Sequence, residues 1–314
     1  MNQKLAEALI NVVMKSAAKV SGTLAPMLID RKKIRRIKNI SYGSHPDQIL
    51  DIYIPRTLTA TFPVSILIHG GGFSFFSKDS HSTAACELAN SGRLVFCINY
   101  RLTPQHPFPA GLTDTIMAYS WIIQNAEKYS GDLNHISIAG ESAGGNFALG
   151  LCLYLYGISK LKTDVILPEI PLQKPKHAII HCGHLHVSNV DRYKSNKELH
   201  PLVMSRILQI QKNYLPSFQQ IAENEAGLAD PLVEIEKFVK RNEALPENFP
   251  QIFVPVGDRD PVIGDSIRLA SALELLGQKD RLKIYAGEGH AFYVMPFRKK
   301  TRACWDDIFK FLNS

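Results

Sequence analysis

The sequence predicts an α/β fold in which a mostly parallel, eight-stranded sheet carries helices on both faces. Three observations predict it: apolar runs rich in β-branched residues recur along the chain, helical patterns separate most of them, and the length of 314 residues suits one α/β domain with a small appendage. Uniformly apolar strands are typical of a parallel sheet, because both of its faces are buried.

The elements follow one another in the order that this fold requires. Strands are predicted at residues 34–42, 48–54, 64–69, 94–99, 136–139, 178–182, 251–256 and 281–286. Helices are predicted at residues 80–91, 110–128, 142–157, 264–277 and 301–313. The segment GSHPDQ between the first two strands has the composition of a turn.

Residues 184–246 interrupt the alternation of strands and helices. They contain helical stretches near 201–215 and 231–243 but no strong strand pattern. The N-terminus reads as an amphipathic helix that is retained in the protein, because charged residues interrupt its short apolar stretch. We therefore predict a single domain over residues 1–314, with a helical cap built from 1–30 and 184–246.

Most of the net charge of +7 comes from one short stretch of the chain. A basic stretch that begins at Arg31 and ends at Lys38 holds six Lys and Arg, and the remaining 30 basic residues nearly balance the 29 acidic ones. We predict no nucleic-acid partner. A solvated strand edge is the favoured interpretation of this stretch, and weak contact with an anionic membrane surface is the alternative. Self-association into a homo-oligomer stays open.

Cysteine usage favours a reducing compartment. The five cysteines are odd in number, contain no CxxC pair and mostly lie in apolar contexts. Buried thiols are therefore expected rather than disulfides, and the predicted location is cytoplasmic. No apolar run reaches the roughly 20 residues of a membrane-spanning helix.

The first motif that carries chemistry is GESAG at residues 140–144, with Ser142 at its centre. An apolar strand precedes it and a helical pattern follows it, which is the context of a nucleophile elbow. An ordinary tight turn with a helix-capping serine is the structural alternative. A serine hydroxyl is a weak nucleophile, so it needs a neighbouring base and groups that stabilise an oxyanion.

A second motif, HGGGF at residues 69–73, directly follows the strand VSILI. Its three glycines allow backbone amides to approach a ligand closely, as in the HGGG-type oxyanion motif. A flexible glycine loop is the alternative interpretation. Two such motifs, in this order and each after a strand, make coincidence a poor explanation.

With these motifs, the chain resembles the bacterial hormone-sensitive lipase-like family of α/β hydrolases. The segments that carry the resemblance are HGGGF at 69–73, YRLTPQHPFPA at 100–110, GESAGGN at 140–146 and GDRDP…GEGHAF at 257–292. The resemblance implies the α/β-hydrolase fold, serine esterase activity without a cofactor, and oxyanion donors at the backbone amides of Gly71, Gly72 and Ala143. Departures from the family pattern, at Glu141, Thr103 and Gln105, bear on substrate preference and rate.

His290 is the predicted base, because it lies 148 residues after the serine, in the Ser–acid–His order of this fold. Three carboxylates follow the strand QIFVPV and compete for the role of the acid. Asp260 is preferred because Pro261 follows it and it lies 30 residues before the histidine. Asp258 is expected to form the turn, and Asp265 to cap the next helix.

Three further histidines, His181, His184 and His186, cluster in the segment HCGHLH. Because no other ligand is spaced to complete a metal site, no metal is predicted, and we expect these histidines to line the pocket or a loop.

The predicted reaction is hydrolysis of short- to medium-chain acyl esters through an acyl-enzyme. Ser142 is the nucleophile, and Asp260 orients His290. A deacetylase or an acyltransferase with the same triad is the nearest alternative. A non-catalytic ligand-binding protein of the same fold is disfavoured, because all three triad residues are present.

Overall fold

The computed structural model describes residue 16 and residues 33–314, apart from 58, 194–198, 217–225 and 295–297. Its strands are β1 (Ile34–Ser41), β2 (Ile49–Pro55), β3 (Phe62–Ile68), β4 (Leu94–Ile98), β5 (Gly131–Glu141), β6 (His177–His181), β7 (Gln251–Gly257) and β8 (Leu282–Tyr285). They form one eight-stranded sheet in the order β1-β2-β4-β3-β5-β6-β7-β8. β2 runs antiparallel to both of its neighbours, and β3 to β8 are parallel. The predicted mostly parallel sheet is confirmed.

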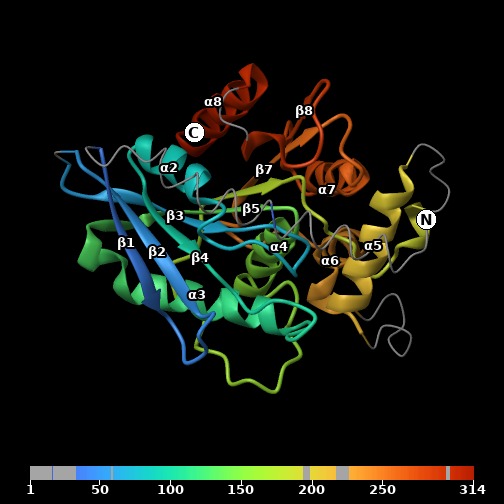
Figure 1. The fold of residues 1–314 in the computed structure, drawn as a ribbon, viewed down its shortest axis with the longest axis horizontal. Coiled ribbons are helices and arrows are strands. Elements are labelled where there is room, and N and C mark those ends of the chain that lie inside the picture. The colour runs from blue at the N-terminus through green and yellow to red at the C-terminus, as the bar shows by residue number, and fades with distance from the viewer. Residues whose placement is uncertain (1–15, 17–32, 58, 194–198, 217–225, 295–297) are drawn as a thin grey trace.

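Helices cover both faces of this sheet (Figure 1). The described α-helices are α2 (Ser82–Asn90), α3 (Ala110–Asn125), α4 (Ala143–Leu155), α5 (Pro201–Tyr214), α6 (Pro231–Lys240), α7 (Ile263–Leu275) and α8 (Lys299–Leu312). Along β3, Val64, Ile66 and Ile68 pack into the core that contains α3 and α4, whereas Leu67 packs into the core that contains α2 and α8. This alternation is the two-residue period of a strand, and it explains why the strand sequences are apolar on both sides.

The segment between β6 and β7 contributes α5, α6 and two short 3₁₀ helices, Asp191–Tyr193 and Gly227–Ala229, but no strand among its described residues. In Figure 1, α5 and α6 lie together at one end of the sheet. The other predicted cap element, residues 1–30, lies outside the described residues apart from residue 16. Within the described part of the chain, no helix is long and apolar enough to cross a membrane.

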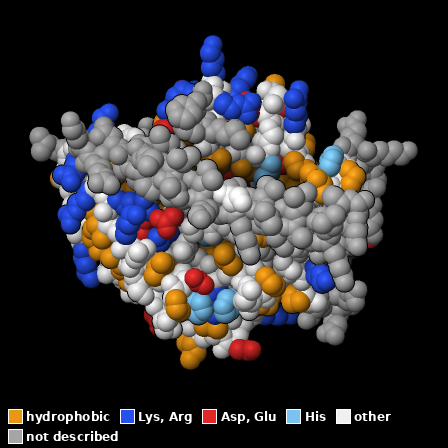
Figure 2. All heavy atoms as spheres, viewed as in Figure 1, with side chains coloured by type: hydrophobic (Ala, Val, Ile, Leu, Met, Phe, Trp, Pro, Cys, Tyr) orange, Lys and Arg blue, Asp and Glu red, His pale blue; other side chains and the backbone are white. Residues whose placement is uncertain are grey.

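The described part of the basic stretch leads into β1, the strand at one edge of the sheet. Arg35 and Lys38 are exposed, and Lys and Arg side chains gather along this edge in Figure 2. Arg36 is different, since its Nε donates to Asp51 Oδ2 at 2.7 Å and its Nη2 to Asp79 Oδ1 at 2.6 Å. One basic residue of the stretch is therefore committed to internal ion pairs.

Asp51 holds this edge of the sheet together, and its removal should be costly. The carboxylate is fully buried and also lies 3.1 Å from Nζ of the buried Lys78. Asp51→Ala would leave the buried cations Arg36 and Lys78 with Asp79, which is partly exposed, as their remaining carboxylate partner. We therefore expect a loss of about 3 kcal/mol in the free energy of unfolding, the lower end of the cost of breaking a buried ion pair. Urea denaturation at pH 7 measures the loss.

The matched control is Asp306→Ala, which removes an exposed carboxylate whose ion-pair partner in the described part of the chain is Arg302 on α8. This surface pair should contribute less than about 1 kcal/mol. Equal losses in the two variants would contradict the role assigned to Asp51.

Candidate active site

Ser142 lies at the sharp turn between β5 and α4. Its φ of 54° and ψ of −112° place a non-glycine residue in a sparsely populated conformation, which costs on the order of 1–3 kcal/mol and persists only where the surroundings enforce it. The neighbouring glycines are sterically required. A Cβ on Gly140 would lie 2.1 Å from the Gly144 carbonyl oxygen, and one on Gly144 would lie 2.2 Å from that of Ile68. The local sequence thus builds an elbow that presents the serine hydroxyl at the end of the strand.

The structure brings three predicted site residues into one hydrogen-bonded chain. His290 Nε2 lies 2.9 Å from Ser142 Oγ, and His290 Nδ1 lies 2.8 Å from Asp260 Oδ2. The Asp260 side chain is fully buried, and one third of the His290 side chain is exposed. A serine hydroxyl, an imidazole and a buried carboxylate therefore meet at the carboxyl ends of β5, β7 and β8.

The other two candidate carboxylates do not reach the imidazole. Asp258 Oδ1 accepts a hydrogen bond from Gly287 N at 2.7 Å, which ties the turn after β7 to the loop after β8. Asp265 lies inside α7 and caps no helix, so that expectation is wrong. Its buried carboxylate accepts from Leu185 N at 2.8 Å and pairs with Arg192 at 2.9 Å. The Asp265 carboxylate therefore holds the loop after β6 against α7.

The charges around His290 favour its protonated form. Burial alone would lower its pKa, but Cys182 and Asp260 outweigh burial, and the pKa is raised well above the usual value. Burial raises the pKa of the Cys182 thiol to about 11, so this thiol is uncharged at neutral pH. We therefore assign the shift at neutral pH to the Asp260 carboxylate.

The predicted oxyanion donors come from two loops at the same edge of the sheet. β3 and β5 are parallel neighbours with Ile68 opposite Gly140, so the glycine loop after β3 lies beside the elbow that contains Ala143. Gly71 and Gly72 have φ values of +113° and +58°, a region that favours glycine. Backbone geometry thus explains why this loop contains glycines.

A model of the alpha/beta hydrolase fold family matches residues 65–294, most of the chain. The chain belongs to this α/β-hydrolase family. Carboxylesterase NlhH of Mycobacterium tuberculosis is 34% identical over 124 residues, which are 39% of this chain and 39% of that protein. Isoprenylcysteine alpha-carbonyl methylesterase ICME of Arabidopsis thaliana is 27% identical over 286 residues, which are 90% of this chain and 63% of that protein. The match thus spans less than two thirds of either relative.

Among solved structures, esterase LipW from Mycobacterium marinum superposes on this α/β hydrolase with a TM-score of 0.76 at 20% identity, over 96% of this chain and 88% of that one. A hyperthermophilic esterase from Pyrobaculum calidifontis gives a TM-score of 0.73 at 22% identity, over 99% and 96% of the two chains. At these identities, the similarity establishes the fold.

Glu141, the departure before the serine, has a partner in this α/β hydrolase that the sequence did not indicate. Its Oε2 lies 2.9 Å from His81 Nε2, and its Oε1 lies 4.0 Å from His290 Nε2. Burial alone would raise the pKa of Glu141, but the hydrogen bond to His81 outweighs burial and lowers it. A second negative charge therefore lies beside the base.

Cys182 is a further neighbour that sequence analysis missed. It directly follows β6, and its Sγ lies 3.2 Å from His181 Nδ1. Among the described residues, the donor atoms close enough to share a metal ion belong to Glu141, Cys182 and His290, within 4.8 Å of one another. This group contains none of the three clustered histidines. A cysteine beside a strand end gives no sequence signal that distinguishes it from an ordinary core thiol.

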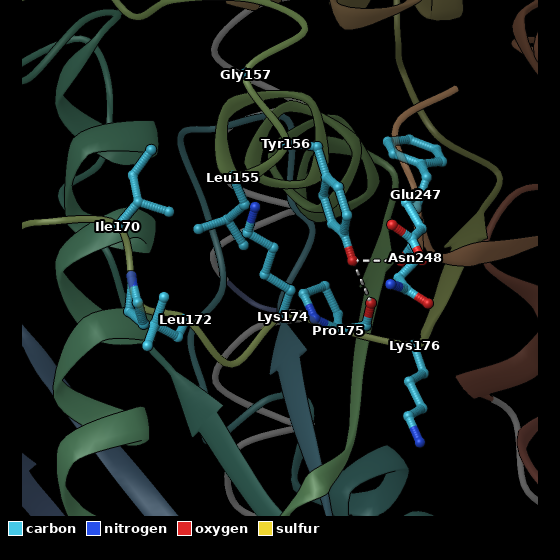
Figure 3. Close-up of a pocket in the computed structure, with 12 residues that line it drawn as sticks. Leu155, Tyr156, Gly157, Ile170, Leu172, Lys174, Pro175, Lys176, Glu247 and Asn248 are labelled. Carbon is cyan, nitrogen blue, oxygen red and sulfur yellow. Dashed lines mark hydrogen bonds between the residues drawn. The ribbon is translucent and has the colours of Figure 1, made fainter. Parts of the chain in front are cut away.

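A cavity of about 840 Å³ lies at the amino ends of β6 and β7, opposite the carboxyl ends that carry Ser142, Asp260 and His290. In Figure 3, Tyr156 projects into it, and its hydroxyl donates to the carbonyl oxygens of Pro175 at 3.1 Å and Asn248 at 2.6 Å. Ser142 lies where β5 ends, so this cavity is separate from the candidate active site.

Proposed function

We propose that this α/β hydrolase hydrolyses carboxylic esters through an acyl-enzyme on Ser142. The single observation that carries the proposal is the hydrogen-bonded chain from Ser142 through His290 to Asp260. The names of its relatives, among them a carboxylesterase and an esterase, agree with it.

Each residue of the chain has one task in the proposed mechanism. His290 Nε2 accepts the proton of Ser142 as Oγ attacks the ester carbonyl, and the buried Asp260 stabilises the imidazolium that forms. The N–H groups of Gly71, Gly72 and Ala143 hold the oxyanion. His290 then protonates the departing alcohol and activates the water that releases the acid. The proposed steps need no metal or cofactor.

Helices α5 and α6 cap the proposed site in this scheme. Two contacts support that role: the Tyr214 ring stacks on Phe73 of the glycine loop with centroids 3.8 Å apart, and the Tyr214 carbonyl accepts from Phe108 N at 3.0 Å. These contacts connect the end of α5 to two of the segments that carry family motifs, 69–73 and 100–110. Residues 1–30 stay a predicted part of the cap.

Short- to medium-chain acyl esters are the proposed substrates, and a chain-length series tests them. With p-nitrophenyl esters from acetate to palmitate, we expect kcat/KM to be highest at eight or fewer acyl carbons. Highest activity on the longest chains would contradict the substrate class. No turnover of any ester, together with no serine labelling by an organophosphate, would overturn the enzyme itself.

Activity should increase with pH through a raised pKa. Only neutral His290 can accept the serine proton, and its pKa is raised, so the acidic limb of kcat/KM should have its midpoint above pH 6.5. Buffers from pH 5 to 9, corrected for spontaneous hydrolysis, measure it.

Two variants identify which neighbouring group raises the pKa of His290. Asp260→Asn should lower the pKa of the His290 imidazole, because it removes the carboxylate that favours the imidazolium; NMR titration of the imidazole measures this, since the variant is nearly inactive. Cys182→Ser should leave the midpoint unchanged, because the thiol is uncharged in this range. A midpoint that follows Cys182 instead would contradict our assignment.

Three further expectations stay predictions: a cytoplasmic location, homo-oligomer formation, and weak contact between residues 31–38 and an anionic membrane surface. With Arg36 in ion pairs, Arg35 and Lys38 are the exposed cations that β1 offers for such contact. Vesicle binding that does not weaken with added salt would exclude an electrostatic contact.

A further inference from the structure

Arg206 of α5 lies against the backbone of the glycine loop. Its Nη2 donates to the Gly71 carbonyl oxygen at 3.3 Å. A Cβ added to Gly72 would lie 2.6 Å from the same nitrogen. The guanidinium is therefore a direct neighbour of two of the three residues that we propose as oxyanion donors.

The charge of Arg206 has no counter-ion among the described residues. Apart from Gly71, it contacts Gln209 Oε1 at 3.0 Å from Nη1 and the Phe75 ring at 4.8 Å, and both are uncharged. By contrast, Arg36, Arg101 and Arg268 each pair with a carboxylate. Burial lowers the pKa of Arg206 to about 10, so the side chain stays protonated at neutral pH. A partly desolvated cation without a partner favours an incoming anion.

His184 supplies a second polar group without a partner. It lies in the loop after β6, is 3% exposed, and its backbone N donates to the Ser142 carbonyl at 3.1 Å. Its buried Nε2 has no hydrogen-bond partner in the described structure.

Arg206 is among the charged groups that act on the His184 ring. Burial, and then the positive charges of Arg192, His290 and Arg206, lower its pKa to about 3. The ring is therefore neutral, and Nε2 can carry the proton and donate it. Arg192 is paired with Asp265, which leaves Arg206 as the cation near His184 that lacks a carboxylate.

We propose that Arg206 and His184 form an anion subsite beside Ser142, and that the preferred substrates are esters that carry a carboxylate. This proposal rests on the proposed esterase activity and names its substrate class. The planar guanidinium offers charge-assisted hydrogen bonds to a carboxylate, and His184 offers a neutral donor. One unpaired cation balances one negative charge, so a carboxylate monoanion fits better than a phosphate dianion.

A matched pair of methyl esters tests the subsite. Monomethyl glutarate and methyl pentanoate have the same number of acyl carbons, and only the first ends in a carboxylate. Titration of the released acid at constant pH gives kcat/KM for both. We expect the wild-type protein to favour the charged ester at least about 10-fold, the scale of a hydrogen bond to a charged group.

Single substitutions show which residues produce the preference for the charged ester. Arg206→Met should lower the ratio of charged to neutral ester by about 10- to 100-fold, and Arg206→Lys should restore part of it. His184→Phe keeps a ring in place but removes the donor, so it should lower the ratio several-fold. Lys212→Met is the control, because it removes the same charge from an exposed position of the same helix; its ratio should equal that of the wild type.

The ratio distinguishes recognition from loop positioning. If Arg206 only holds the Gly71 carbonyl in place, Arg206→Met will slow both esters equally, and the unchanged ratio overturns the subsite. A wild-type protein that hydrolyses methyl pentanoate at least as well as monomethyl glutarate overturns it too, while the esterase stands. If neither ester is hydrolysed and an organophosphate labels no serine, the proposed function fails together with the subsite.

Discussion

Ser142→Ala should lower kcat for p-nitrophenyl butyrate by about 10⁶-fold, the size of loss known for removal of a serine nucleophile. His290 would keep its bond to Asp260, but no atom would remain at 2.9 Å from Nε2 to attack the ester. Labelling by an organophosphate should disappear at the same time. Initial rates and mass spectrometry of the labelled protein measure the two effects.

Ser266→Ala is the matched control for this loss. Ser266 is a fully buried serine on α7, and its Oγ has no hydrogen-bond partner among the described residues. Its replacement removes the same atom from the core without touching the proposed site, so activity and labelling should both persist. Retention of more than a tenth of the activity by Ser142→Ala, or label on a different residue, would refute the assignment of the nucleophile.

Asp260→Asn should lower kcat by about 10⁴-fold while the protein stays folded. Asp260 Oδ1 accepts from Val262 N at 2.8 Å, and Oδ2 faces His290 Nδ1. An asparagine that keeps the first bond turns its NH₂ group toward Nδ1. The imidazole must then carry its proton on Nε2, the nitrogen that faces Ser142, and it can no longer accept the serine proton.

Asp258→Asn is the control for Asp260→Asn, because it makes the same chemical change two residues earlier in the same turn. Its carboxylate contacts Gly287 N and not the imidazole, so kcat should change only a few-fold. Steady-state kinetics with equal thermal unfolding midpoints compare the two variants. A loss of about 10⁴-fold in Asp258→Asn instead would transfer the role of the acid to that residue.

Sequence signals were strongest where a short segment must satisfy its own backbone geometry. The elbow needs glycines at 140 and 144 because any side chain would collide with neighbouring backbone, and the apolar strands reflect a sheet buried on both faces. Such requirements are local, so the motifs and the strand–helix order predicted the fold, which the family match confirms.

Contacts between distant residues carried a weaker signal. Asp258, Asp260 and Asp265 lie within eight positions of each other, and although motif position favoured Asp260, the direction of each side chain decides which one meets His290. Asp265 illustrates the error that follows: its position suggested a helix cap, but its carboxylate bonds Leu185 N, 80 positions away in the chain. Arg206 reaches Gly71 across 135 positions.

The sequence by itself predicted the α/β fold, Ser142 and His290, with Asp260 as the preferred acid, because strand, turn and motif requirements act over a few neighbouring residues. The oxyanion donors Gly71, Gly72 and Ala143 followed from the family resemblance. Only the tertiary structure showed that Asp260 is the carboxylate that contacts His290 and that Cys182 and Glu141 lie beside it. It also showed that, among the described residues, Arg206 has no carboxylate partner and His184 Nε2 has no hydrogen-bond partner. Those outcomes depend on side chains that meet only when the carboxyl ends of separate strands and the helices of the 184–246 segment converge.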